Sequence, residues 1–419
     1  MSEANPLPMK PLAELVTARN VKVAGVKHPD RPYIGLEHMA TRDSNLIGSL
    51  PSWESVSTNN VFEQNDILFG KLRPNLRKCV LATFPGYCST DILVLRVTEE
   101  SVPAFTVKVL QSDMVSRLAT ATAVGTKMPR TNWPALRALS VFAPSIEEQR
   151  RIATILDTLD ESIRQTERVI EKLRRMKQGL LHDLLTRGLD AHGQLRDPQR
   201  HPEQFKDSLL GRVPREWEVT VLGHVLQTTT YGISTSLSTE GDVPVLRMNN
   251  FSEGEADLAD LKYCSRTDAE GLHLRPGDVL FNRTNSIEHV GRTGIWRGQL
   301  PSATFASYLV RLTPVLGRLI GEYLNRWLNL RATQLLIRRW ATPGVQQVNI
   351  NPTNLQKTAI AMPRDLEEQG RICEFLAQHD RSLLEERRSL AKLRTLKHGL
   401  MDDLLTGRVR VDALEEAHA

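Results

Sequence analysis

The stretch Leu173–Gly188 reads Leu-Arg-Arg-Met-Lys-Gln-Gly-Leu-Leu-His-Asp-Leu-Leu-Thr-Arg-Gly. A near copy, Leu-Arg-Thr-Leu-Lys-His-Gly-Leu-Met-Asp-Asp-Leu-Leu-Thr-Gly-Arg, begins at Leu393, 220 residues later. In a chain of 419 residues this offset places one copy at the same point of each half. A string of this length repeated at such an offset indicates an internal duplication. The sequence therefore predicts two equivalent halves.

Composition and charge are those of a globular protein. Hydrophobic residues make up 40% of the sequence and charged residues 25%, which leaves enough apolar surface to offset the entropy of ordering the chain. A length of 419 residues predicts more than one domain. The net charge of +5 is compatible with a polyanionic partner, although such an excess is also common among proteins that bind no nucleic acid.

The cysteines and the first residues bear on the cellular setting. The four cysteines form no Cys-x-x-Cys pair, which predicts neither a zinc site nor a disulfide framework. The first residues lack the apolar core of a signal peptide, and no run of about 18 apolar residues follows. We expect a soluble, cytoplasmic protein without a membrane partner.

A long helix is predicted from Ile146 to Arg187. Ser145 can cap its start, acidic residues follow in the first turn, and Gly188 is a stop signal. No proline interrupts the stretch, so the helix is roughly 60 Å long at about 1.5 Å per residue. Apolar residues recur at spacings of four and three, the pattern of a coiled-coil seam. The seam comprises Ile152, Leu156, Leu159, Ile163, Thr166, Ile170 and Leu173.

A second helix is predicted to begin near Asp365-Leu366-Glu367-Glu368-Gln369. Its seam, 220 residues after the first, comprises Ile372, Leu376, His379, Leu383, Glu386, Leu390 and Leu393. Polar residues interrupt both seams, with Thr166 in register with Glu386 and Leu159 in register with His379. Such residues either fix the register of the helix pair at a cost in stability or contact solvent where the helices separate.

Mixed α/β sequence precedes each long helix. Short strands are predicted at 33–36, 66–69 and 91–97, followed by a helix after Pro103 with Phe105, Val109 and Leu118 on one face. Equivalent strands recur at 245–248 and 277–281, 212 residues later. Glycine, asparagine and proline positions nearer the helix recur at an offset of 219, as expected when loops change length around a kept framework.

The predicted fold class is α+β, with an internal pseudo-twofold repeat. The order along the chain is a globular domain at 1–145, a helix at 146–188, a linker at 189–215, a second domain at 216–362, a helix at 363–408 and a tail at 409–419. Each helix exposes an apolar stripe, for which the other copy is the nearest matching surface. We expect an antiparallel coiled coil; a parallel pair would require the short linker to span the helix length.

Catalytic signatures are missing from the sequence. Gly70-Lys71-Leu72 lacks the glycine and hydroxyl of a phosphate-binding loop, and the histidines show no metal-ligand spacing such as His-Glu-x-x-His. A Gly-x-Ser-x-Gly nucleophile elbow is also missing. Asn351-Pro352-Thr353-Asn354 lacks the second proline and the aromatic residue of an amino-methyltransferase motif, so we interpret it as a turn that starts a helix.

Polar loops at equivalent places in both halves carry residue types that read bases and neutralise phosphates. In the first half these candidates are Lys71, Arg73, Asn75, Arg77, Lys78, Lys127 and Arg130. In the second half they are Tyr231, Arg247, Asn249, Asn250, Asn282, Arg283, Asn285, Arg292, Gln346, Gln347 and Asn349. Any one of them taken singly is better explained as a solvated loop residue, and Tyr231 is explained equally well as a core residue. The two sets together favour DNA binding.

The repeated motifs resemble those of the specificity subunit of type I restriction-modification systems. The resemblance rests on Pro144–Arg151 with Leu173–Gly188, on Pro363–Arg371 with Leu393–Arg408, and on Gly277–Phe281. The segment 206–219 is similar to the family's lead-in to its second target recognition domain. The resemblance covers essentially the whole chain.

The resemblance implies a non-enzymatic subunit with two target recognition domains, each reading one half of an asymmetric, bipartite site in double-stranded DNA. The helices would set the gap between the halves. It also implies two methyltransferase subunits and two restriction-translocase subunits as partners. S-adenosylmethionine, ATP and magnesium would then belong to those partners, and this chain would hold no cofactor.

Two questions stay open at this point. The leucine-rich helix ends exceed what one seam requires, so they either dock the methyltransferase subunits or cover the recognition domain of the opposite repeat. These residues are Leu180, Leu181, Leu184, Leu185, Leu400, Met401, Leu404 and Leu405. The whole chain could also be a coiled-coil adaptor that binds only proteins, or a solitary DNA-binding regulator.

Overall fold

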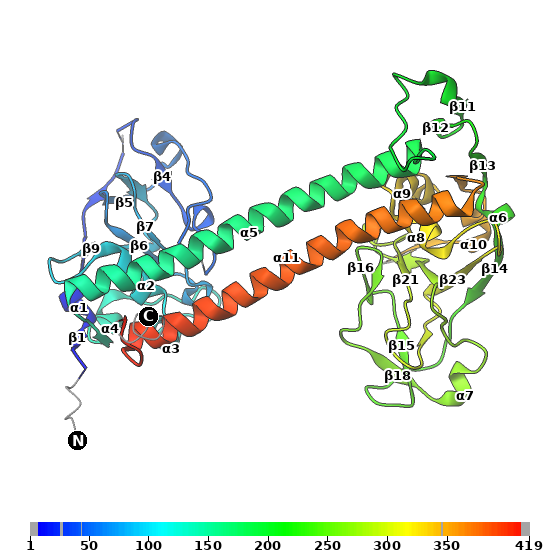
Figure 1. Cartoon of the computed structure of the whole chain (residues 1–419). Coiled ribbons are helices and arrows are strands. Elements are labelled where there is room, and N and C mark those ends of the chain that lie inside the picture. Colours follow the sequence, from blue (N-terminus) through cyan, green and yellow to red (C-terminus); the bar gives the residue numbers. More distant parts are fainter. Residues whose placement is uncertain (1–6, 26–27, 43, 345–346, 412–419) are drawn as a thin grey trace. The chain divides into compact units, whose positions relative to one another are not determined.

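Two long helices organise the computed structural model, which describes residues 7–25, 28–42, 44–344 and 347–411 (Figure 1). Helix α5 spans Ile146–Arg187, the residues predicted for it, and α11 spans Leu366–Thr406. The first turn of α5 is capped by Ser145, whose Oγ accepts a hydrogen bond from the Glu148 amide at 3.3 Å. Asp365 caps α11 in the same way, with Oδ2 accepting from the Glu368 amide at 3.2 Å.

The chain forms two compact units, and each long helix begins in one and ends in the other. The first unit is Met1–Arg168 with Arg387–Ala419, and the second is Val169–Glu386. In the first unit the helix segments are antiparallel, because Asp160 and Glu167 along α5 pair with Lys397 and Arg394 in descending order along α11. Each unit is therefore built from a globular part of one repeat and helix segments of both.

The globular part of the first unit contains two four-stranded sheets. One has the order β2 (Val16–Ala18), β9 (Ile92–Val97), β6 (Ile67–Gly70) and β7 (Cys79–Leu81), all antiparallel. The other has the order β3 (Lys22–Val23), β5 (Asn59–Phe62), β8 (Gly86–Cys88) and β4 (Tyr33–Ile34). Strand β1 (Met9–Pro11) pairs with β10 (Ser140–Phe142). The helices are α1 (Leu12–Leu15), α2 (Pro103–Gln111), α3 (Asp113–Ala121) and α4 (Trp133–Leu136).

The second unit repeats this plan. Its largest sheet has the order β14 (Leu226–Tyr231), β23 (Leu309–Pro314), β19 (Val279–Asn282), β21 (Thr293–Ile295), β17 (Glu255–Ala256) and β16 (Phe251–Ser252). Two three-stranded sheets have the orders β18 (Lys262–Cys264), β15 (Val243–Leu246), β22 (Thr304–Phe305), and β20 (Thr284–Asn285), β25 (Val348–Ile350), β24 (Ala341–Pro343). Strand β13 (Glu218–Val221) pairs with β26 (Ala359–Met362). The helices are α6 (Leu222–Val225), α7 (Arg266–Ala269), α8 (Gly321–Asn329), α9 (Arg331–Arg338) and α10 (Pro352–Leu355).

Strand order and register show the duplication directly. The order β2-β9-β6-β7 is matched by β14-β23-β19-β21. Among the strands described in the first unit, β4 and β8 form the one parallel pair, and it is matched by β15 with β22. The α+β class and the internal repeat predicted from the sequence are thus confirmed.

Two local expectations need correction. Leu118 does not share a helix with Phe105 and Val109, because Ser112 is extended and caps a new helix, α3, through its side chain. The stretch 189–215 is more than a connector, since β11 (Phe205–Ser208) and β12 (Gly211–Pro214) form a hairpin there. The hairpin precedes Trp217, which is fully buried in the core of the second unit.

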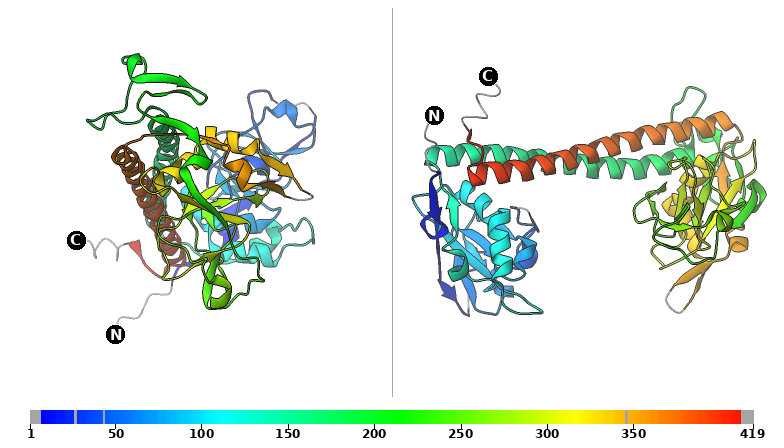
Figure 2. Two further views of the ribbon diagram at one scale, coloured as in Figure 1. Left: turned by 90° about the vertical axis from the view of Figure 1, so that its right-hand side faces the viewer. Right: turned by 90° about the horizontal axis from the view of Figure 1, so that it is seen from below.

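The seam residues have two different surroundings. At the start of each helix they belong to the core of a globular part: Ile152 and Leu156 in the first unit, Ile372 and Leu376 in the second. Figure 2 shows the helix segments of each unit lying along its globular part. Further along, Ile170 and Leu383 are buried, and Leu159, Ile163, Leu173, Leu390 and Leu393 are half-buried. Of the polar seam residues, His379 reaches across the pair, with Nε2 donating to the Leu173 carbonyl at 2.8 Å.

A largely buried carboxylate joins three elements in each unit. Asp160 of α5 accepts from Lys108 of α2 at 2.5 Å and pairs with Lys397 of α11. Asp380 of α11 pairs at 2.6 Å with both Arg326 of α8 and Lys177 of α5. Burial alone would raise the pKa of either carboxyl, but the two cations around each outweigh it and hold both pKa values below the usual range. We call these two groups of three residues the charge clamps.

Asp160→Asn is expected to destabilise the first unit by about 3 kcal/mol near neutral pH, because the buried cation of Lys108 then has the exposed carboxylate of Asp157, at 2.8 Å, as its remaining charged partner. The folded-state pKa of Asp160 is depressed, so the stabilisation is present above the unfolded-state pKa of about 4 and is lost as the pH falls through the folded value. Hydrogen exchange of the α2 amides measures this loss of stability. The difference in exchange between Asp160→Asn and the wild type should become smaller in acid.

Two controls make this test specific. Exchange in α8 should be unchanged in Asp160→Asn and accelerated in Asp380→Asn, since each clamp holds its own unit. Glu147→Gln removes an exposed pair with Arg150 and should change neither. Unaltered α2 exchange in Asp160→Asn would contradict a stabilising role for the clamp.

Candidate nucleic-acid interface

Three chain segments of the first unit meet just after β6. The Lys71 amide donates to the Asp91 carbonyl at 3.0 Å, and the Lys71 carbonyl accepts from the Thr131 amide at 3.0 Å. Arg73 donates through its amide to the Pro129 carbonyl at 2.8 Å. These bonds bring together the loop 71–78, the residue before β9 and the segment 124–131. We call this place the first junction.

The second unit builds the same junction with different side chains. The Arg283 amide donates to the Tyr308 carbonyl at 3.0 Å, and the Arg283 carbonyl accepts from the Ile350 amide at 2.8 Å. Thr284 is in register with Asn349, just as Leu72 bridges to Arg130 in the first unit. We call this place the second junction. The predicted sites at 71–78 with 127–130, and at 283–285 with 347–349, are therefore each brought together.

An ion pair occupies the first junction. Arg130 donates from Nε to Asp91 Oδ1 at 2.8 Å and from Nη2 to Oδ2 at 3.2 Å. The hydrogen bonds from Arg130 keep the pKa of the Asp91 carboxyl below its usual value, and the charge of Lys71 adds to this. Arg73, Asn75 and Lys127 are exposed beside the pair. The site thus presents mostly positive charge around one carboxylate.

Two predicted contact residues of the first unit face their own domain instead. Arg77 forms an ion pair with Asp113 of α3, and Lys78 donates from Nζ to the Leu36 carbonyl at 2.7 Å. Both side chains are half-buried. Arg77 has a φ of +51°, a left-handed conformation uncommon outside glycine and asparagine, which ends the short turn at 74–76. These partners hold the loop, so neither residue is a first choice for touching DNA.

Aromatic and amide groups surround an arginine at the second junction. Arg283 donates from Nη2 to Asn349 Oδ1 at 3.1 Å, and its guanidinium carbon lies 5.0 Å from the ring centre of Tyr231. Tyr231 is 47% exposed and Tyr308 is 46% exposed, so Tyr231 is not the core residue that its sequence also allowed. Gly232 is needed after it, since a Cβ there would lie 2.2 Å from the Phe305 carbonyl oxygen.

The remaining DNA-contact candidates of this unit differ in how far their side chains are exposed. Asn285 and Gln347 are half-buried at the second junction, Asn249 and Arg292 are exposed, and Gln346 lies outside the described residues. Arg247 is half-buried and paired with Asp260 at 2.8 Å.

Asn250 and Asn282 are structural, so the prediction that they bind DNA is wrong. Asn250 is 1% exposed; its Oδ1 accepts from the Arg247 amide at 2.9 Å and its Nδ2 donates to the Asp257 and Ala259 carbonyls. Asn282 is equally buried and donates from Nδ2 to the Met248 carbonyl at 2.9 Å. Both amides tie turns together from inside the domain.

The leucine-rich helix ends also have a structural role. Leu184 and Leu185 lie in the core of the second unit, and Leu404 and Leu405 in the core of the first. Leu180, Leu181, Leu400 and Met401 pack half-buried against the same cores. The predicted docking of a partner on these side chains is therefore wrong for the four buried ones. They cover the globular part at the far end of each helix, which is the alternative drawn from the sequence.

Sequence reasoning missed the residues that fix the start of each long helix on its globular part. Gln149 accepts through Oε1 from the Val102 amide at 2.9 Å and donates through Nε2 to the Pro144 carbonyl at 2.9 Å. Gln369 makes the same bonds with Ile320 at 2.9 Å and Pro363 at 2.8 Å. Their recurrence at an offset of 220 was the available signal.

Glu148 and Glu368 form a second tie beside these glutamines. Glu148 is paired with Arg410, and Glu368 with Arg196, each arginine following the far end of a long helix. Glu368 also accepts from the Trp217 indole at 3.1 Å. The chain that leaves each helix is thus bound back to the start of the other one.

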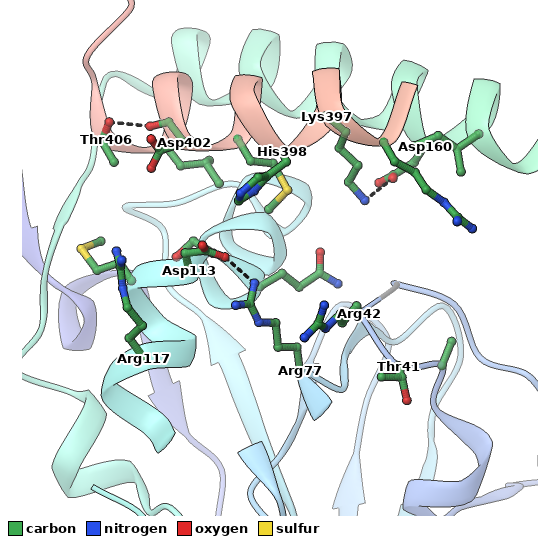
Figure 3. Close-up of a pocket in the computed structure, with 18 of the residues that line it drawn as sticks. Thr41, Arg42, Arg77, Asp113, Arg117, Asp160, Lys397, His398, Asp402 and Thr406 are labelled. Atoms are coloured by element: carbon green, nitrogen blue, oxygen red, sulfur yellow. Dashed lines mark hydrogen bonds and ion pairs between the residues drawn. The ribbon is translucent and has the colours of Figure 1, made fainter. Parts of the chain in front are cut away.

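A groove of about 810 Å³ lies between α3, the loop at 40–42 and the helix segments of the first unit (Figure 3). Arg42, Arg117 and His398 line it together with Asp113 and Asp402. Of the residues predicted to contact DNA, Arg77 alone lines it, and it does so while paired with Asp113. The groove and the first junction therefore share Arg77 but no other residue predicted to contact DNA.

Metal and membrane features were searched in the part of the chain that the structure describes. No group of three or more His, Cys, Asp or Glu side chains could hold a metal ion there. Within the same residues, no helix is both long and apolar enough to cross a membrane.

Comparison with known proteins agrees with the geometry. Residues 23–175 and 214–394 match the family described as the type I restriction modification DNA specificity domain. The chain belongs to this family. The two matched stretches fall one in each repeat, and members of the family are the non-catalytic, DNA-sequence-recognising components of type I systems. A protein-only adaptor is therefore not favoured.

Individual relatives are more distant. The chain is 28% identical over 208 residues to the putative type I restriction enzyme MjaX specificity subunit of Methanocaldococcus jannaschii, covering 49% of each protein. It is 26% identical over 315 residues to the MjaVIII specificity subunit of the same organism, covering 69% of this chain and 67% of that one. The match thus spans about half the length of the first relative.

A solved structure shares the fold over nearly the whole length. It comes from work on complex assembly and conformational transition of the type I R-M system, is 21% identical and has a TM-score of 0.59. The likeness covers 97% of this chain and all of that one.

The structural assignment of Asn250 can be separated from that of its exposed neighbour. Asn250→Ala is expected to lower the free energy of unfolding of the second unit by about 1–3 kcal/mol, because buried amide and carbonyl groups lose their partners. Asn249→Ala should leave stability unchanged, since that side chain is exposed. Thermal unfolding of the two variants is the measurement; equal stability would contradict the structural role.

Proposed function

We propose that each unit reads one half of a bipartite DNA site through its junction, and that the two long helices set the gap between the halves. The observation that carries this is the junction itself, which is made twice by the same main-chain hydrogen bonds with different side chains around it. A repeated framework with different exposed groups suits a reader of two unlike half-sites.

The proposed partners are double-stranded DNA, two adenine methyltransferase subunits and two restriction-translocase subunits. Two equivalent units in one chain favour two copies of each partner. Those partners would bind S-adenosylmethionine, ATP and magnesium, and the chain would work in the cytoplasm. Because Leu184, Leu185, Leu404 and Leu405 are buried, the proposed contacts with the methyltransferase subunits lie on other surfaces of the helices or domains.

Reconstitution of this chain with the methyltransferase encoded by a neighbouring gene tests the proposal. Mapping of methylated adenines over a genome should give one asymmetric motif with two specified parts and an unspecified gap. Binding to DNA carrying that motif should weaken steeply with salt, as lysines and arginines displace counterions. Methylation without a shared two-part motif would contradict the proposal. Stable assembly with the methyltransferase but without DNA binding would favour the adaptor.

A heptad insertion tests whether the helices set the gap. One heptad placed between Arg168 and Val169, with a matching one between Glu386 and Arg387, keeps the seam and falls at the boundary of the two units. Seven residues rise about 10 Å, so the unspecified gap should lengthen by about three base pairs. Methylation should also slow, because three base pairs turn the half-site by roughly a quarter turn or more.

Methylome sequencing reads the gap directly. The control is a single inserted residue at the same two places, which breaks the seam and should abolish the motif. An unchanged gap in the heptad variant would show that the helices do not act as the spacer.

A further inference from the structure

We propose that Arg130 and Arg283 are the guanine-reading residues of the chain, one in each unit, and that each is held in position by its junction before DNA arrives. This rests on the proposed function and adds to it the identity of one base in each half-site. Guanine presents two adjacent acceptors, N7 and O6, in the major groove, and the guanidinium fork matches them with two donors.

In the first junction the position of Arg130 is set by Asp91. The carboxylate takes the Nε and Nη2 edge of the guanidinium, at 2.8 and 3.2 Å. The edge formed by Nη1 and the second hydrogen of Nη2 points away from that contact, and Nη1 has only a long bond of 3.4 Å to the Met128 carbonyl. The Arg130 side chain is 43% exposed, so this edge can meet a base. A bidentate carboxylate also removes rotamer freedom that binding would otherwise cost.

In the second junction the arginine and the residue that holds it stand at other positions than in the first. Asn349 stands where the first junction has Arg130, and Arg283 stands where it has Lys71, as the shared hydrogen bonds show. The Asn349 amide oxygen takes one Nη2 hydrogen of Arg283 at 3.1 Å, and the Tyr231 ring lies against the guanidinium at 5.0 Å. An amide and an aromatic face thus replace the carboxylate of the first junction.

Arg73, a basic residue of the first junction, lacks this fixation. Among the described residues, no hydrogen bond or ion pair is made by the side chain of Arg73, which is exposed on the same loop as Lys71. An exposed cation of this kind suits phosphate neutralisation, for which a lysine serves as well. Replacement of arginine by lysine keeps the charge and removes the fork, so it separates base reading from phosphate binding.

The test uses the reconstituted complex of full-length chain and methyltransferase, with methylome sequencing and methylation rates on cognate duplexes. Arg130→Lys should relax one G·C position in one half of the motif, and Arg283→Lys one G·C position in the other. Each should slow methylation of the cognate site by about 10- to 100-fold, the usual value of a bidentate base contact. Arg73→Lys should keep the motif, because neutralising a phosphate needs only the charge. Arg200→Lys, at an exposed position of the 189–215 stretch outside both junctions, is the matched control and should change neither motif nor rate.

Several outcomes overturn the inference. One is a half-site made only of A·T pairs in the wild-type motif; another is an unchanged motif in both arginine-to-lysine variants. Equal relaxation at every position would indicate a phosphate contact instead. Hydrogen exchange of the β9 and β23 amides checks that the variants fold. The proposed function fails separately, if the wild-type complex gives no two-part motif at all.

Discussion

Everything in the architecture depends on a carboxylate held between two cations inside each unit. Taking Asp160 or Asp380 out of water is unfavourable by several kcal/mol unless positive groups surround it closely. One cation comes from a helix of the globular part, Lys108 or Arg326, and the other from the opposite long helix. Neither repeat supplies the whole set, so each unit is complete only when helix segments of both repeats are present.

The charge clamps and the glutamine ties act at different points along the same helices. Gln149 and Gln369 bind the helix starts to main-chain groups of the globular parts, while the clamps lie about three turns further on. Two fixed points along a stiff element leave little freedom to pivot. Each junction is therefore carried on strands whose orientation to the nearby helix segments is set, which is how precise sites are built on rigid elements.

The sequence predicts this fold well where a pattern has one physical cause. Caps, the lack of proline and Gly188 define α5 from Ile146 to Arg187, and duplication transfers the same reasoning to α11. Prediction from the sequence fails where one residue type serves two purposes. In the sequence, Asn250 cannot be told from Asn249, which is exposed, nor Leu184 from a leucine that docks a partner, until burial is known. The charge clamps could not be predicted, because partners such as Lys108 and Asp160 are far apart in sequence.

Main-chain hydrogen bonds explain how one scaffold can carry two junctions with different side chains. Both junctions are closed by amide and carbonyl groups of Lys71 or Arg283, so their assembly does not depend on which side chains stand there. Asp91 and Arg130 in one unit are replaced by Tyr308 and Asn349 in the other without disturbing the bonds. Different side chains at these positions therefore change the groups that the junction exposes while the same main-chain hydrogen bonds form. In the proposed function, stability resides in the clamps and cores, and specificity in side chains that the fold leaves free to vary.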